Sequence, residues 1–124
     1  MNIKVLAKAL VGNVRAKCFQ VQAGKNVYIG KHCALKGKQN IVLGDSVTVR
    51  PYAQIWSGGG TVRIGAGSEI GERCRISIAN SLNIGEKVLL SPNVYITDCD
   101  HEYRNISVPV IDQGIAQKGQ TVSI

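Results

Sequence analysis

The sequence predicts an all-β solenoid of stacked parallel strands, and the main reason is a phrase that recurs along the chain. The phrase is aliphatic, any residue, aliphatic, glycine, and its complete copies occupy residues 21–24, 41–44, 62–65 and 82–85. A fifth copy begins at residue 122 and reaches the last residue before its glycine. Successive copies are spaced by 20, 21, 20 and 40 residues. Self-similarity at a fixed period of this length is typical of stacked repeats.

A shorter repeat of six residues lies inside each period of about 20 residues. Positions six apart form rows of three, and eleven of these twelve positions hold Ile, Leu or Val. The rows are Ala23, Ile29, Leu35, then Leu43, Val49, Ile55, then Ile64, Ile70, Ile76, and last Ile84, Leu90, Ile96. Six residues are too few for a helix and a turn but suit a short strand and a bend. We therefore expect three strands per coil, forming a triangular prism that holds these rows inside.

Residues 1–20 are predicted to form an amphipathic helix at the open end of this prism. Their apolar residues follow a helical period: Ile3, Leu6, Ala7, Leu10, Val11, Val14 and Cys18. Residues 1–44 hold eight Lys or Arg and no Asp or Glu. Two interpretations stay open. The helix can cap the end of the solenoid, as such folds require, or it can make a peripheral membrane contact, since a basic amphipathic helix can lie on anionic lipid.

Composition fits one domain with a narrow interior. The chain has 124 residues, of which 5% are aromatic, so residues 21–124 are expected to be one solenoid domain. No apolar run reaches the roughly 18 residues that span a bilayer, and no signal peptide is evident. The four cysteines form no C-x-x-C pair, and Cys33 and Cys74 fall at inward sites for small side chains. They indicate core thiols in a reducing cytoplasm. The sequence contains no motif of a known nucleic-acid-binding domain.

Two histidines are present, and only one lies where the repeat fails. His32 falls at an outward turn position and is expected to be solvated. His101 lies near the start of a polar stretch, residues 98–120, that is expected to be a loop. Long loops in regular domains are usually functional. A neutral imidazole, with an ordinary pKa of about 6.5, can remove a proton from an attacking hydroxyl. A neighbouring carboxylate or carbonyl would have to fix the tautomer of this imidazole. The candidates are Asp98, Asp100 and Glu102, and the sequence does not choose between them.

The hexads themselves resemble a known family. Segments of the form aliphatic-Gly-x-x-small-x, such as residues 70–75, are similar to the hexapeptide-repeat acyltransferases, and the resemblance extends over residues 21–124. It implies a left-handed parallel β-helix, whereas the general rule for parallel crossovers is right-handed. Residues 84–101 narrow the match. Their Ile-Gly…Pro-Asn-Val coil, followed by His101, is similar to the galactoside, maltose and polysaccharide O-acetyltransferases.

The resemblance implies an activity and a role for His101. The expected reaction moves an acetyl group from acetyl-CoA, a co-substrate, to a sugar or polysaccharide hydroxyl by direct attack, without an acyl-enzyme. His101 would be the general base, and candidates for the acceptor side are Asp98, Asp100, Glu102, Tyr103 and Arg104. The family forms homotrimers with active sites between subunits. Side chains too large for the prism interior favour such an interface, and they are Tyr52, Trp56 and Tyr95.

Three further expectations concern the cofactor, metals and an alternative function. In the family the thioester cofactor lies along further C-terminal coils. This sequence stops at Ile124 within a repeat phrase, so those coils are expected to be missing and no cofactor contact is assigned. No metal site is expected, because the related carbonic anhydrases use three His per metal and this chain has two, 69 residues apart. The alternative function is a non-catalytic trimeric β-helix module or a truncated, inactive acyltransferase fragment.

Overall fold

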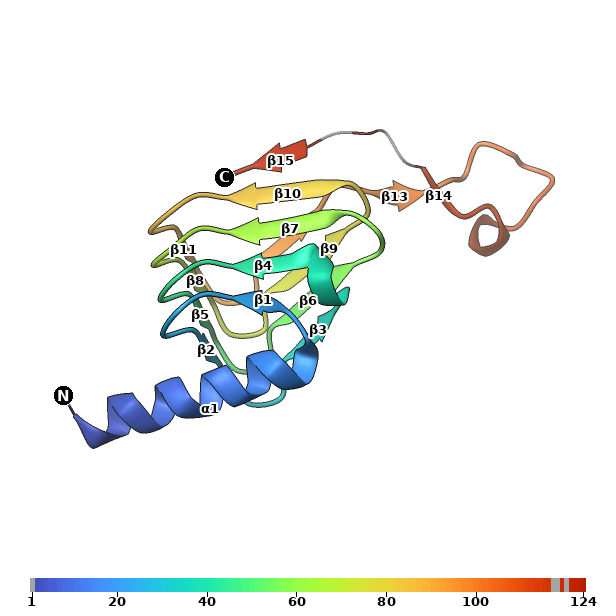
Figure 1. Cartoon of the computed structure of the whole chain (residues 1–124). Helices are drawn as coiled ribbons and strands as arrows, with labels where there is room; N and C mark the ends of the chain where they lie inside the picture. The colour runs from blue at the N-terminus through green and yellow to red at the C-terminus, as the bar shows by residue number, and fades with distance from the viewer. Residues whose placement is uncertain (1, 117–118, 120) are drawn as a thin grey trace.

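The structure, a computed structural model, describes residues 2–116, 119 and 121–124. It is a parallel β-solenoid of about four turns with a single N-terminal helix, which confirms the predicted fold class (Figure 1). Helix α1 spans Ile3–Phe19. Among the described residues, no helix is long and apolar enough to cross a membrane.

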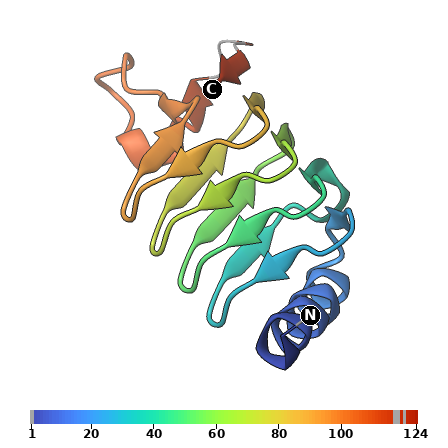
Figure 2. The same cartoon turned by 90° about the vertical axis from the view of Figure 1, so that its left-hand side faces the viewer.

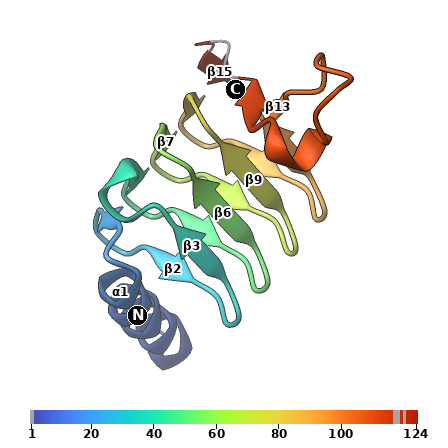
Figure 3. The ribbon, with the colours of Figure 1, turned by 90° about the vertical axis from the view of Figure 1, so that its right-hand side faces the viewer.

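Each coil adds one strand to each of the three faces of a prism (Figure 2, Figure 3). The first sheet stacks β1 (Gln22–Ala23), β4 (Ile41–Leu43), β7 (Thr61–Ile64), β10 (Ser81–Ile84) and β15 (Thr121–Ser123). The second stacks β2 (Tyr28–Ile29), β5 (Thr48–Val49), β8 (Glu69–Ile70) and β11 (Leu89–Leu90). The third stacks β3 (Ala34–Lys36), β6 (Gln54–Ser57), β9 (Arg75–Ile78) and β12 (Tyr95–Thr97). A 3-10 turn, Lys38–Asn40, joins β3 to β4.

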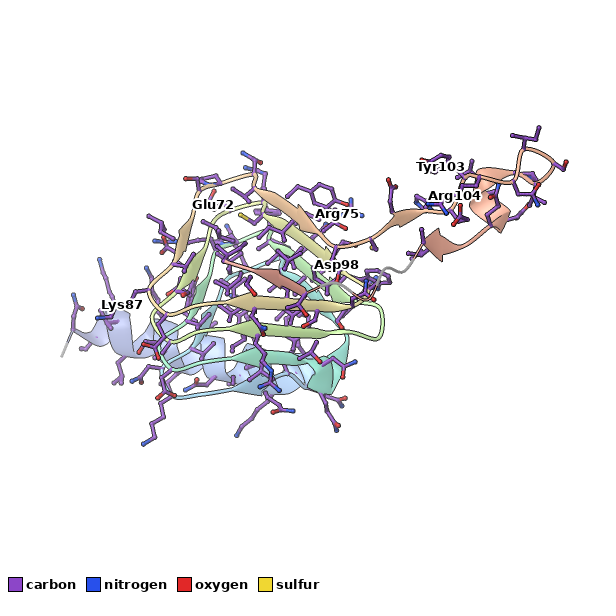
Figure 4. The ribbon with its side chains drawn as sticks, turned by 90° about the horizontal axis from the view of Figure 1, so that it is seen from above. Glu72, Arg75, Lys87, Asp98, Tyr103 and Arg104 are labelled. Carbon is purple, nitrogen blue, oxygen red and sulfur yellow. The ribbon has the colours of Figure 1, made fainter. Side chains whose placement is uncertain are left out.

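The winding of the solenoid is left-handed. In Figure 1 the strands β1, β4, β7 and β10 run from right to left across the near face while the chain climbs away from α1. Seen from above in Figure 4, the chain turns clockwise as it rises toward the viewer. This is the hand that the family resemblance implies, and it is opposite to the hand usual for parallel crossovers.

Stacking in register makes one continuous apolar core. Of the twelve positions in the predicted rows, eleven are buried. Successive coils place these residues on one another, since Ile29 pairs with Val49 and Val49 with Ile70. The exception is Ala23, in β1, which is exposed. A slip of one residue would turn every row outward, so the pattern of aliphatic residues fixes the register.

Small inward side chains tie three corners of the prism to the coil above. Cys33 Sγ donates to the Arg50 carbonyl at 3.1 Å, and Cys74 Sγ donates to the Ser91 carbonyl at 3.1 Å. Ser68, which is buried at the preceding corner of the same coil as Cys74, donates from its Oγ to the Gly85 carbonyl at 2.7 Å. Burial raises the pKa of the Cys33 thiol, which keeps the thiol protonated at neutral pH. These contacts agree with the predicted structural role of both cysteines.

Helix α1 covers the open end of the prism through its small residues. Gly12 and Ala16 are buried against the first coil. Arg15 Nη1 donates to the Ile29 carbonyl at 2.8 Å and so pairs part of the open strand edge. The apolar residues that predicted the helix lie on its other side and are all exposed: Ile3, Leu6, Ala7, Leu10, Val11, Val14 and Cys18. The helix therefore packs on the solenoid through its face of small residues, and not through the apolar face that the sequence pattern indicated. Met1, at the start of the predicted helical region, lies outside the described residues.

The predicted loop at residues 98–120 contains secondary structure. Strand β13 (Asp100–His101) pairs antiparallel with β14 (Ile115–Ala116). A 3-10 turn, Val110–Asp112, lies between them. We call residues 99–116 the arm, and Figure 1 shows it projecting from the end of the stack opposite to α1. The expectation of a structureless loop was therefore wrong for this segment. Residues 117, 118 and 120 of the predicted loop lie outside the described residues.

After the arm the chain returns to the first sheet. Strand β15 pairs parallel with β10, with Val122 beside Leu82. The fifth copy of the phrase therefore stacks directly on the fourth. Its spacing of 40 residues represents one step of the stack plus the excursion, and not two coils.

The substitution Gly12→Ala tests the docking of α1. Alanine stabilises an exposed helix position by about 1 kcal/mol relative to glycine. Here, however, the new Cβ would overlap the Val27 carbonyl oxygen and would lie 2.6 Å from Tyr28 Cα. Backbone atoms cannot move aside cheaply, so we expect overpacking to dominate and the free energy of unfolding to fall by about 1–3 kcal/mol. Urea unfolding measures this change, with the exposed Asn13→Ala as control. A stabilised Gly12→Ala protein would contradict the packing.

Candidate functional site

The outer surface of the third sheet carries two ladders of side chains. Strand residues alternate between the two sides of a sheet, so residues flanking the buried row point outward. One ladder, in register across the four strands, is Ala34, Gln54, Arg75 and Tyr95. The second ladder is Lys36, Trp56, Ser77 and Thr97. This face therefore presents aromatic, cationic and hydroxyl groups side by side.

A groove of about 480 Å³ lies between this face and the root of the arm. Its lining includes Trp56, Arg75, Tyr95, Asp100, His101 and Ile115. The guanidinium carbon of Arg75 lies 6.0 Å from the centroid of the Tyr95 ring, within the range of a cation–π contact. Trp56 and Tyr95 remain 37% and 61% exposed. Both aromatic residues therefore lie outside the prism, as predicted from its narrow interior.

Internal hydrogen bonds hold the arm. The Glu102 N–H donates to the Gly114 carbonyl at 2.9 Å, which extends the pairing of β13 with β14. Farther along the arm, Gln113 Nε2 donates to the Asn105 carbonyl at 2.8 Å. The Gln113 side chain also accepts from the Asn105 N–H at 3.2 Å. The side-chain amide of Gln113 therefore binds both backbone groups of Asn105 and joins the two sides of the arm. These bonds give the arm, including the strand that carries His101, a defined internal shape.

His101 lies in β13, with its side chain exposed and lining the groove. Its backbone N–H donates to Asp100 Oδ1 at 2.8 Å. Within the described part of the chain the His101 ring makes no hydrogen bond. The imidazole can therefore face a molecule in the groove. Of the predicted site residues, the structure brings His101 and Asp100 together at this lining.

Asp98 has a different task from the one that its position in the sequence suggested. Its Oδ1 accepts from the Ala79 N–H, and its Oδ2 accepts from the Asn80 and Ser81 N–H groups, all at 2.8 Å. These donors form the corner of the coil below, before β10. Figure 4 shows Asp98 at the corner of the prism and not out on the arm. Because both oxygens are engaged there, Asp98 fixes the point at which the chain leaves the stack.

The other candidates lie farther along the arm. Glu102 Oε1 accepts from the Tyr103 and Arg104 N–H groups at 3.1 Å. Arg104 Nε lies 3.9 Å from the same oxygen. Figure 4 shows Tyr103 and Arg104 well out from the prism. These residues shape the arm, and they are separate from the part of the groove that His101 lines.

Sequence reasoning placed Trp56 outside the prism but missed the groove wall that it forms with Lys36 and Arg75. The alternation of inward and outward positions in each third hexad could have found it, because residues next to a buried row share one outer face. No comparable signal pointed to Ile115. It reaches the groove only through the pairing of β14 with β13, and strands of two residues leave no pattern in a sequence.

The remaining candidates for chemistry lie elsewhere. His32 is exposed at a corner of the first coil with φ 57°, and its ring stacks on Tyr52 with centroids 5.0 Å apart. It is an outward turn residue, as predicted. In the described part of the chain, no group of three or more His, Cys, Asp or Glu could hold a metal ion.

In comparisons with known proteins, no protein-family model, curated protein or solved structure matches the chain. The groove and the residues that line it are therefore the basis on which a function can be argued.

Asp98→Ala tests whether this carboxylate supports the fold. The change leaves three backbone N–H groups of the corner without their acceptor. We expect the free energy of unfolding to fall by about 2–4 kcal/mol. The same substitution at the exposed Asp112 is the matched control and should change stability by less than about 0.5 kcal/mol. Equal stability of the two variants in urea unfolding would show that the corner does not depend on Asp98.

Proposed function

We propose that the protein is an acyl-CoA-dependent O-acetyltransferase that moves an acetyl group to a sugar or polysaccharide hydroxyl. The observation that supports this most directly is the position of His101, which lines the groove at the root of the arm with its ring exposed. The resemblance of residues 84–101 to the hexapeptide-repeat O-acetyltransferases implies a general base at this residue. The left-handed solenoid agrees with that resemblance.

In the proposed reaction the acceptor attacks the thioester directly. The neutral imidazole of His101 takes the proton of the acceptor hydroxyl while its oxygen bonds to the thioester carbonyl carbon. The C–S bond then breaks, and the departing CoA thiolate takes the proton back from the imidazolium. No acyl-enzyme is needed, and the buried thiols of the core play no part.

The groove offers distinct surroundings to the two substrates. Lys36 and Arg75 add positive charge to the sheet side of the groove, which suits the phosphates of acetyl-CoA. Asp100 adds negative charge beside His101, which favours a neutral hydroxyl over an anionic acceptor. The exposed rings of Trp56 and Tyr95 give flat apolar surfaces beside these charges.

Assembly and location belong to the same proposal. We infer a homotrimer in which the groove of one subunit meets its neighbour, because Trp56 and Tyr95 leave apolar area exposed beside the site. We also infer a cytoplasmic location, where acetyl-CoA is formed and cysteines remain reduced. All four cysteines of this chain are free.

His101→Ala is the direct test of the proposed base. We expect kcat for acetyl transfer to fall by roughly 10² to 10⁴, the usual contribution of a positioned general base. The KM for acetyl-CoA should change little, because the imidazole acts on the hydroxyl.

His32→Ala is the matched control for His101→Ala. His32 is also exposed but lies on a corner of the first coil, so its loss should leave both kcat and KM unchanged. Near-full activity of His101→Ala, or equal damage from both substitutions, would exclude the proposed mechanism. The non-catalytic β-helix module would then be the better account.

Arg75→Gln tests the charge of the groove. If Arg75 binds a phosphate of the donor, the KM for acetyl-CoA should rise by about tenfold while kcat changes little. Arg63→Gln, an exposed residue on the first sheet, is the matched control and should leave the KM unchanged. A donor KM unaffected by Arg75→Gln would place acetyl-CoA elsewhere.

A further inference from the structure

Helix α1 presents a stripe of aliphatic side chains away from the solenoid. Its buried residues, Gly12 and Ala16, lie on one side of the helix. The exposed stripe lies on the other side, because residues three, four and seven apart share one side of an α-helix. Its members and their exposed fractions are Ile3 at 83%, Leu6 at 50%, Leu10 at 59%, Val11 at 43% and Val14 at 61%. A contiguous apolar surface of this kind usually marks an interaction site.

Positive charge is concentrated at the same end of the molecule. Residues 1–44, which form α1, the first coil and strand β4, hold eight Lys or Arg and no Asp or Glu. Residues 45–124 hold seven Lys or Arg and eight Asp or Glu. Lys4 and Lys17 are both exposed on α1 itself. The end that carries the apolar stripe is therefore strongly cationic, whereas the rest of the solenoid is close to neutral.

The helix also has the right position to meet a flat surface. It lies across the end of the stack, and none of the other described elements covers its outer side (Figure 1, Figure 2). The arm that carries His101 projects from the opposite end. A planar partner could therefore contact α1 without covering the groove.

We propose that this face of α1 docks on an anionic lipid surface. A basic amphipathic helix lies in the membrane interface with its apolar side among the acyl chains and its lysines at the headgroups. Each lysine near such a surface adds to the attraction. A second copy of the chain is a poor occupant of the same face, because two ends that both carry a net positive charge would repel each other.

The apolar part of the proposal is tested with vesicles and a matched pair of variants. The full chain should sediment with vesicles of phosphatidylcholine containing about 30% phosphatidylglycerol, and not with pure phosphatidylcholine. Leu10→Gln with Val14→Gln should lower the partition coefficient about tenfold or more. Both sites are exposed and glutamine is a good helix former, so the fold should persist, as circular dichroism will check. Ile106→Gln with Ile111→Gln removes two aliphatic side chains that are 99% and 85% exposed on the arm, and it should have no effect.

The charge part of the proposal is tested in the same assay. Lys4→Gln with Lys17→Gln should weaken binding roughly fivefold per lysine, and added salt should weaken it further. Arg63→Gln with Lys87→Gln removes two exposed charges from later coils and is the control. Failure to bind the anionic vesicles, or equal losses in the test and control pairs, would overturn the proposal. So would a change of oligomeric state in Leu10→Gln with Val14→Gln without lipid, because the stripe would then be covered by a second copy. None of these measurements depends on acetyl transfer.

Discussion

The backbone pairing between successive coils is the constraint on which the rest of this structure depends. Strands of two to four residues have no stability alone, and each gains its hydrogen-bond partners only from the coil above or below. The aliphatic rows keep that pairing in one register, as in the column of Ile29, Val49 and Ile70. At the two ends of the stack, different groups pair with the open strand edge. Arg15 donates to an open carbonyl at the first coil, and β15 pairs with β10 at the last.

A segment such as the arm can be inserted into this stack only where the neighbouring coils keep the register of their strand pairing. Asp98 makes that insertion possible, because its carboxylate holds three backbone N–H groups of the coil below. The arm then begins beside the groove, and after it β15 resumes the first sheet. Asp98 and Asp100 are two residues apart but have separate roles. The first secures the corner, and the second contacts the backbone of His101, the one histidine that lines the groove.

The sequence was sufficient for the parts of the structure that repeat. The aliphatic rows predicted the core. The fifth phrase marked a further copy of the repeat at residue 122, but the sequence did not predict that this copy stacks directly on β10. The packing face of α1 was not predicted, because the apolar period was the stronger pattern. Gly12 and Ala16, small residues four apart on one face, were the available signal for close approach. The pairing of β13 with β14 and the contacts of Asp98 depend on tertiary geometry that no periodicity encodes, so they could not be predicted.

The central claim is that ligands of the groove meet His101. The chain has two histidines, so the imidazole signals of the protein with isotope-labelled histidine can be followed by NMR during titration with acetyl-CoA or with an acceptor saccharide. Because His101 lines the groove and His32 lies on a corner of the first coil, we predict that the ring signals of His101 shift in a saturable way while those of His32 stay in place. Unchanged His101 signals at saturating ligand, or equal shifts of both histidines, would contradict the account.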